Sequence, residues 1–112
     1  MDDVLDEIRK FRDDRDWKRF HNPKDLAVSV AIEAAELLEH FQWKDEEESM
    51  RHAREQREAV ADEIADVAIY LIELADILDI EVGAAIRAKL AKNAVRYPVD
   101  KSRGVSTKYT KL

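Results

Sequence analysis

The chain has 112 residues and no cysteine, which indicates one domain without disulfides or thiol chemistry. Charged residues make up 39% of it, and two Gly and two Pro predict long helices with few turns. No stretch combines a basic start with an apolar run, and none approaches the ~20 apolar residues of a membrane span. We therefore expect a cytoplasmic protein that does not act in a membrane.

The net charge of −6 is unevenly distributed. Residues 1–86 contain 11 basic and 24 acidic side chains, whereas residues 87–112 contain 8 basic side chains and only Asp100. An acidic body disfavours nucleic acid as a partner. An acidic cluster needs a cation, and a basic terminal segment suits a phosphate. The alternative is a solvated acidic surface with a disordered basic tail.

Hydrophobic spacing predicts an all-α fold of four helices with a long third helix. The expected helices cover residues 2–16, 23–43, about 45–79 and about 80–96. We expect one domain over residues 1–98, followed by a polar, mobile tail over 99–112.

Capping signals support these limits. Pro23 suits the first position of a helix, and Asp45 with Glu48 forms a capping-box pattern. Asp79 is expected to cap the fourth helix, which Tyr97-Pro98 should end.

Two pairs of carboxylates occupy equivalent positions on the second and third helices. At ~100° per residue, Glu33 and Glu36 lie at one edge of an apolar face. The second pair, Glu63 and Asp66, lies at the same edge of its own helix. If the apolar faces pack antiparallel, the four acids meet at the seam. Oxygen ligands suit Mg²⁺, or Mn²⁺ as a substitute. The alternative is that the acids are solvated helix-edge charges, which is less favoured for two pairs in the same register than for one.

Two neighbours of these pairs require separate interpretation. Glu39 repeats the three-residue spacing from Glu36 but points further from the apolar face, so it is a candidate outer ligand or general base. His40 lies on the carboxylate stripe, where we expect a hydrogen-bonded neighbour rather than a ligand.

Aromatic and basic residues offer possible contacts for a nucleotide. Trp17 and Trp43 flank the second helix with flat faces on which a base can stack, although ordinary packing also explains them. Lys89, Asn93 and Arg96 share one face of the fourth helix, either as a phosphate-binding group or as a solvated cationic stripe.

At these residues the chain resembles the MazG-like all-α nucleoside triphosphate pyrophosphohydrolases. The family pattern appears as EAAE and EIAD, with 26 residues between them. The segments RDWKRFHNPKDLA, ELLEHFQWK, DEIADVAIYLIELA and KNAVRYP resemble the dCTP pyrophosphatase branch and its short bacterial and archaeal relatives. The resemblance covers roughly residues 4–98.

The resemblance implies Mg²⁺-dependent cleavage between the α- and β-phosphates of a nucleoside triphosphate, which gives a monophosphate and pyrophosphate. It also implies a homotetramer, a dimer of dimers, that cleanses the nucleotide pool of dCTP-like or modified pyrimidine nucleotides. The implied metal ligands are Glu33, Glu36, Glu63 and Asp66. The implied substrate contacts are Trp17, His21, Trp43, Tyr70, Lys89, Asn93, Arg96 and Tyr97.

The sequence leaves several alternatives for the base preference, the catalytic residue and the function. Ile8 stands where some relatives carry a polar residue near the base, so the preferred base is undetermined. The general base can be Glu36, Glu39 or Glu63. A non-catalytic helical interaction module is the alternative from another class. A dUTPase-type enzyme or a phosphoribosyl-ATP pyrophosphohydrolase is the alternative among related enzymes.

Overall fold

The computed structural model describes residues 2–111, and these form helices and loops without any strand. The predicted all-α class is confirmed. Its helices are α1 Asp2–Asp14, α2 Pro23–Glu39, α3 Glu46–Glu55, α4 Arg57–Ile77, α5 Val82–Arg96 and α6 Val99–Ser102. Within residues 2–111, no helix combines the length and apolar character that crossing a bilayer requires. Met1 and Leu112, the outermost residues of the expected domain and tail, lie outside the described residues.

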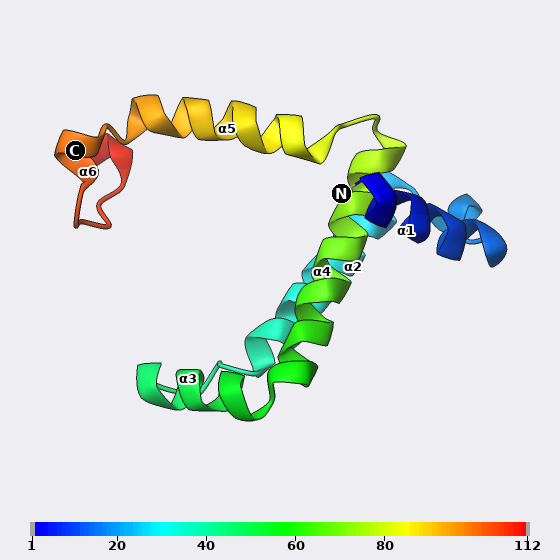
Figure 1. The fold of residues 1–112 in the computed structure, drawn as a ribbon, viewed down its shortest axis with the longest axis horizontal. Helices are drawn as coiled ribbons and strands as arrows, with labels where there is room; N and C mark the ends of the chain where they lie inside the picture. The colour runs from blue at the N-terminus through cyan, green and yellow to red at the C-terminus, as the bar shows by residue number, and fades with distance from the viewer. Residues whose placement is uncertain (1, 112) are drawn as a thin grey trace. The chain divides into compact units, whose positions relative to one another are not determined.

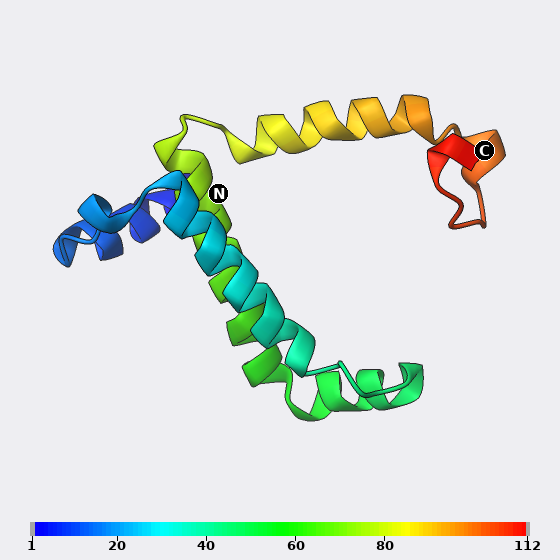
Figure 2. The same cartoon turned by 180° about the vertical axis from the view of Figure 1, so that it is seen from behind.

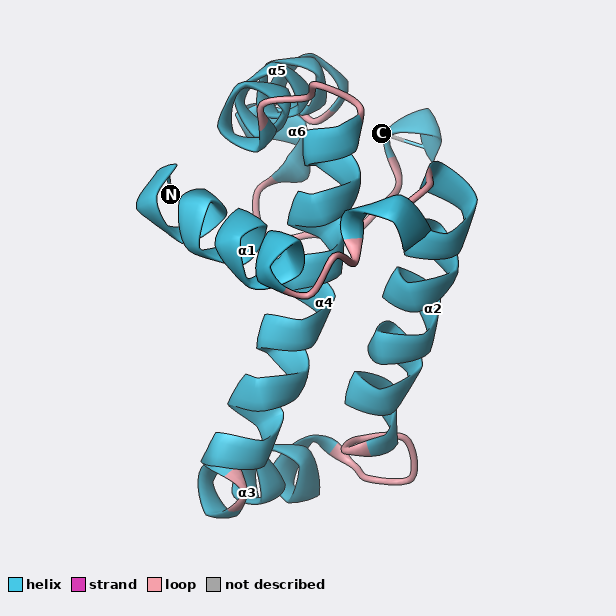
Figure 3. Ribbon diagram, turned by 90° about the vertical axis from the view of Figure 1, so that its right-hand side faces the viewer, coloured by secondary structure: helices cyan, strands magenta, loops and turns pink. Residues whose placement is uncertain are grey.

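The chain divides into two compact units, Met1–Asp79 and Ile80–Leu112. In the first unit, α2 and α4 run side by side in opposite directions (Figures 1 and 2). The α3 segment lies at the end where these two helices are connected, and α1 packs near the other end of α4 (Figure 3). The predicted antiparallel pair is therefore present.

Local signals determine how α2 and α3 begin. Asn22 caps α2 by accepting a 2.9 Å hydrogen bond from the Asp25 N–H, and Pro23 follows at the first helical position. The Asp45 carboxylate accepts a 2.8 Å hydrogen bond from the Glu48 N–H and caps α3. The sequence predicted both helix starts, the first from Pro23 and the second from Asp45, whereas the Asn22 cap was not predicted.

The prediction of one long third helix is wrong, because the helix breaks at Gln56 into α3 and α4. Gln56 has φ −112° and ψ 35°, outside helical geometry, although neither Gly nor Pro is nearby. Its N–H still donates to the His52 carbonyl at 2.8 Å, and its carbonyl accepts from the Val60 N–H at 3.0 Å. These bonds limit the free-energy cost of the break. With the helix broken here, the side chain of His52 on α3 reaches the His40 ring at the end of α2.

The expected cap of the fourth helix is also corrected. Asp79 adopts a positive φ of 55° at the end of the α4 region. The cap of α5 is Glu81, whose carboxylate accepts hydrogen bonds from the Gly83 and Ala84 N–H groups. A Glu can cap in this way because its longer side chain folds back over the first turn.

The second unit contains α5 and the segment that follows it. The helix ends at Arg96, just before Tyr97-Pro98, as predicted. The following segment, expected to be irregular, contains α6 and a short 3-10 helix, Tyr109–Lys111. Tyr109 packs edge-on against Tyr97, with ring centroids 5.8 Å apart, and it also lies under the Arg96 guanidinium. The mobility of this segment and the domain boundary near residue 98 stay predictions.

A single chain buries little apolar surface. Among the described residues, Leu26 and Val60 are the only buried hydrophobic side chains. The predicted apolar faces of α2 and α4 together form what we call the apolar stripe. Several of its side chains are about half exposed, with 56% for Leu38, 54% for Ile64 and 48% for Leu71. The burial expected for this stripe is therefore incomplete within one chain.

Candidate metal centre

The carboxylates lie in the seam between α2 and α4 rather than at the edge of the packed face. Glu33 and Glu63 are half-buried, as are neighbouring facing positions such as Leu37 and Val67. The facing positions recur at alternating steps of three and four residues, which is the spacing of packed antiparallel helices. The face along which α2 and α4 pack against each other is therefore rotated from the predicted apolar stripe toward the acids. That rotation leaves the far side of the stripe exposed.

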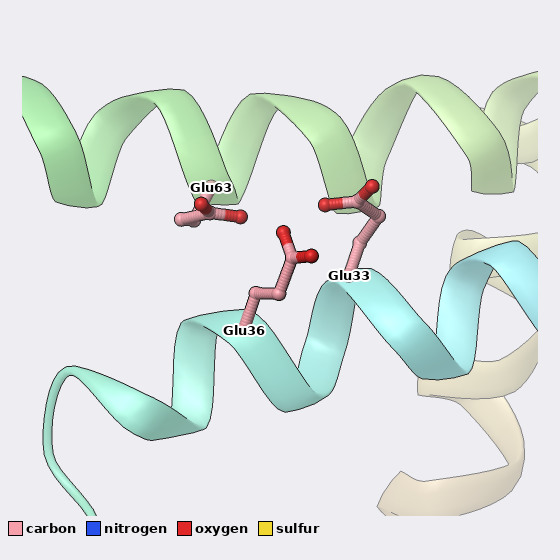
Figure 4. A group of neighbouring side chains, drawn as sticks. All are labelled: Glu33, Glu36 and Glu63. Atoms are coloured by element: carbon pink, nitrogen blue, oxygen red, sulfur yellow. The ribbon is translucent and has the colours of Figure 1, made fainter.

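Three of the four predicted ligands converge across this seam. Ligand oxygens of Glu33, Glu36 and Glu63 all lie within 4.8 Å of one another. Glu36 projects from α2 into the space between Glu33 and Glu63 (Figure 4). The grouping follows from the i,i+3 pair on α2 and from the antiparallel packing that brings α4 opposite it.

The proximity of the carboxylates raises the pKa of two members of the cluster, Glu33 and Glu63. A shared hydrogen bond with Glu36, together with desolvation and the charges of Glu36, Asp66 and Glu63, raises the pKa of Glu33 to about 7. Desolvation, followed by the Glu36 charge, raises the pKa of Glu63. Both perturbed groups face each other across one seam, which is typical of a functional site.

The donor set of the cluster fits a hard divalent cation. Glu33 Oε2 and Glu63 Oε2 are buried and have no hydrogen-bond partner. Among residues 2–111, no Lys or Arg forms an ion pair with any of the three carboxylates. Buried carboxylate oxygens without partners are costly unless a cation compensates them. Oxygen-only ligation is what Mg²⁺ prefers.

Asp66 and Glu39 lie outside the tight group. Asp66 is half-buried one turn beyond Glu63, and its charge contributes to the raised pKa of Glu33. Its carboxylate is close to the cluster but does not belong to the group within 4.8 Å. Glu39 is the last residue of α2 and is exposed. The roles predicted for both residues stay predictions.

The two tryptophans are not brought together within one chain. Trp17 is 46% exposed and packs edge-on against Phe11, with ring centroids 5.7 Å apart. Trp43 is 88% exposed and follows α2. They lie beyond opposite ends of a helix of 17 residues, which is about 25 Å long. A single chain therefore does not place both rings around one base.

Tyr70 and His21 occupy different surroundings in the first unit. Tyr70 is half-buried one turn beyond Asp66, and desolvation followed by the Glu33 charge raises its pKa. His21 Nδ1 is buried without a hydrogen-bond partner and lies 3.9 Å from Glu73 Oε2. Desolvation and the Arg12 charge lower the pKa of His21, so its ring is neutral near pH 7.

The remaining predicted substrate contacts belong to the second unit. Lys89, Asn93 and Arg96 lie on α5, and Tyr97 follows directly. The Arg96 guanidinium lies 4.8 Å from the Tyr109 ring centroid. Arg96 and Tyr97 are thus held by a residue of the terminal segment, whereas the nucleotide contacts expected of all four stay predictions.

Sequence reasoning missed two groups of interacting residues. Arg12 and Glu73 are 3% and 5% exposed, and Arg12 and Arg9 both bind Asp76. The three-residue spacing of Arg9 and Arg12 was the available signal, but nothing local revealed a partner more than 60 residues away. The second group is His40, which pairs with His52 at 2.8 Å and not with the neighbouring acids.

Known proteins are similar to this chain over most of its length. Residues 28–112 match the MazG-like family. The chain is 40% identical to dCTP pyrophosphatase 1 from Bos taurus and 37% identical to dCTP pyrophosphatase 1 from Homo sapiens. Each alignment covers 97% of this chain and 68% of the relative. The crystal structure of a pyrophosphatase from Archaeoglobus fulgidus superposes with a TM-score of 0.85 at 45% identity, covering 88% of this chain and 92% of that one.

Proposed function

The chain belongs to the MazG-like family, and from that premise we propose that it is a Mg²⁺-dependent nucleoside triphosphate pyrophosphohydrolase. The reaction is cleavage of the anhydride between the α- and β-phosphates, which gives a nucleoside monophosphate and pyrophosphate. One observation carries the proposal: three carboxylates converge within 4.8 Å, and two of their buried oxygens lack any partner.

The chain's own residues supply the ligands and the base. Glu33, Glu36 and Glu63 would hold the ion, with Asp66 as a fourth ligand. Bound Mg²⁺ would neutralise the phosphates and lower the pKa of a coordinated water. Glu36, Glu39 or Glu63 accepts the proton of the attacking water. The water oxygen then bonds to the α-phosphorus, while the bond from this phosphorus to the α–β bridging oxygen breaks and pyrophosphate leaves.

The proposed substrate is a dCTP-like or modified pyrimidine nucleotide, and the proposed role is cleansing of the nucleotide pool. The identity of 40% to a dCTP pyrophosphatase supports this choice. Trp43, which is 88% exposed, offers a ring for stacking a base. The residues proposed to hold the sugar and phosphates are Tyr70, Lys89, Asn93, Arg96 and Tyr97, and His21 is a further proposed substrate contact.

The proposed active form is a homotetramer, a dimer of dimers. The exposed apolar side chains of α2 and α4, including Leu38, Ile64 and Leu71, support association between copies. Enclosure of the nucleotide also favours it, because Trp17 and Trp43 can share a base only across a subunit boundary. One surface hollow lies elsewhere, at α3. It is lined by Asp45, Met50 and Arg54 and contains none of the three carboxylates.

Product analysis tests this proposal. The purified chain is incubated with dCTP, 5-modified dCTP, dTTP, dUTP, dATP and phosphoribosyl-ATP, each with Mg²⁺ and with a chelator. We expect a pyrimidine monophosphate and pyrophosphate in equal amounts, only when Mg²⁺ is present. Preferential hydrolysis of dUTP or phosphoribosyl-ATP would assign the chain to a related enzyme. Absence of turnover on the whole panel, or release of single phosphate, would exclude the proposed reaction.

A further inference from the structure

Two histidines from different helices meet beside the carboxylate seam. His40 Nδ1 lies 2.8 Å from His52 Nε2, and the ring centroids are 5.0 Å apart. His40 is the C-cap of α2, whereas His52 belongs to α3. Both side chains are half-buried. The contact therefore joins two elements that a 12-residue separation brings together.

The surroundings hold the two rings in place. Phe41 packs edge-on against His52, with centroids 5.9 Å apart, and it also contacts His40 at 6.1 Å. The backbone at both positions is fixed, because the His40 N–H bonds to Leu37 and the His52 carbonyl accepts from Gln56. Little side-chain entropy remains to be lost when a third partner binds between the rings.

The protonation state suits a ligand role. Desolvation, followed by the charges of Lys44 and His40, lowers the pKa of His52, while the carboxylate of Glu55 acts in the opposite direction. The His52 ring is therefore neutral near pH 7. Neutral imidazole is the form that coordinates a metal ion, since the free nitrogen lone pair is the ligand.

The two nitrogens are close enough to bind one ion without a large movement of either ring. Two nitrogens at about 2.05 Å from an ion lie about 2.9 Å apart at a right angle, and about 3.3 Å apart in a tetrahedron. The observed 2.8 Å, which the hydrogen bond between the rings sets, is close to the spacing of two adjacent positions on an octahedral or tetragonal ion. Tetragonal nitrogen and oxygen ligation is typical of Ni²⁺ and Cu²⁺.

We propose that His40 and His52 form a two-imidazole chelate for a divalent transition ion of the nickel or copper class, distinct from the carboxylate centre. Among the described residues, the groups of three or more potential ligands consist of the carboxylates alone. Water therefore completes the coordination of the chelated ion. On binding, the proton of the hydrogen bond moves to the other nitrogen of the donating ring, which frees the lone pair of the contacting nitrogen. The ion then replaces the hydrogen bond between the rings and links α3 to the end of α2.

Calorimetric titration of the full chain, free of any affinity tag, with Ni²⁺ tests the proposal. Excess Mg²⁺ is present so that the carboxylates are already occupied. We expect one Ni²⁺ per chain, with affinity at least about tenfold weaker in His52→Gln and in His40→Gln. Gln keeps a hydrogen bond between the helices but removes one imidazole. Arg51→Ala, which removes an exposed neighbour on α3, should bind as the parent does.

Two further measurements make the result decisive. Circular dichroism checks that each variant is folded, and Cu²⁺ electron paramagnetic resonance counts the coordinated nitrogens. Two nitrogens are expected in the parent and one in either Gln variant. Equal Ni²⁺ affinity in parent and His52→Gln would overturn the proposal, as would absence of Ni²⁺ binding by the parent. Neither readout depends on hydrolysis, so failure of the proposed enzyme activity is a separate outcome.

Discussion

Arg12 Nη1 lies 3.2 Å from Asp76 Oδ2, and this contact joins α1 to the C-terminal part of α4 across 64 residues of sequence. The Arg9 guanidinium binds the same carboxylate. Hydrogen bonding to Arg9 and the nearby charges of both arginines hold the pKa of Asp76 below its usual value. The buried Arg12 guanidinium is therefore compensated by two acids, Asp76 and Asp13, whose Oδ1 lies 2.8 Å from Arg12 Nε.

Replacing Asp76 by Asn should lower the free energy of unfolding by about 3 kcal/mol, because it leaves the Arg12 charge buried with poorer compensation. Urea denaturation monitored by circular dichroism measures the change. Asp14→Asn is the matched control, because Asp14 pairs with Lys10 at 2.7 Å on the exposed side of α1 and should matter little. Equal effects of the two substitutions would contradict this account.

The raised pKa of Glu33 predicts that metal-free stability falls as pH rises. The folded chain keeps the Glu33 proton up to about pH 7, whereas the unfolded chain loses it near pH 4.5. The stabilising contribution is therefore complete below pH 4.5 and is lost as pH rises through about 7. Mg²⁺ should reverse this loss because it binds the ionised carboxylates.

Thermal unfolding across this pH range, with chelator and with Mg²⁺, measures the effect. Glu33→Gln should flatten part of the decline, while Glu63, whose pKa is also raised, maintains the remainder. Glu39→Gln should retain the whole decline, because Glu39 lies outside the cluster. A metal-free midpoint that rises over the same range would refute the assigned direction.

Glu36 and Glu39 should respond very differently to substitution. Glu36→Gln is expected to lower kcat at least about 100-fold, because it removes a central ligand of the cluster. The same change should raise metal-free stability, since the Glu36 charge disfavours ionisation of both Glu33 and Glu63. Glu39→Gln should lower kcat by less than about tenfold. Steady-state kinetics and thermal unfolding supply the two readouts. A larger loss in Glu39→Gln would instead identify Glu39 as the base.

Exposed apolar side chains on α4 predict that association stabilises the chain. Ile64→Asp places a charge on a side chain that is 54% exposed in one chain and should shift the protein to a smaller species. Light scattering after size exclusion measures the mass, and the parent midpoint should rise with concentration. Glu58→Lys, on an exposed position of the same helix, is the control. Unchanged mass in Ile64→Asp would show that this stripe is not an interface.

The predictable parts of the fold were those encoded locally. Pro23 and Asp45 marked helix starts because Pro favours the first helical position, and because the Asp45 carboxylate and its target N–H lie within three residues. The break at Gln56 was not predictable, since neither Gly nor Pro lies near it to disfavour a helix. Asp79 failed as a cap because the backbone turns to a positive φ there, which leaves Glu81 to reach the free N–H groups.

The candidate site was predictable to a similar extent. The paired spacings on two helices pointed to Glu33, Glu36 and Glu63, which the structure brings together. Rotation of the packed face was not visible on a helical wheel, because the apolar stripe also includes side chains that stay exposed within one chain. The distance from the Asp66 carboxylate to the other three likewise depends on how α2 and α4 pack against each other.

The break at Gln56 also divides the first unit into segments of unequal local stability. α4 continues through the seam with α2, whereas α3 is held there by the rings of His40, Phe41 and His52. Opening α3 therefore need not disturb the carboxylate seam. In hydrogen–deuterium exchange, the α3 amides should become deuterated well before those of α4, so one continuous stretch of sequence behaves as two cooperative units.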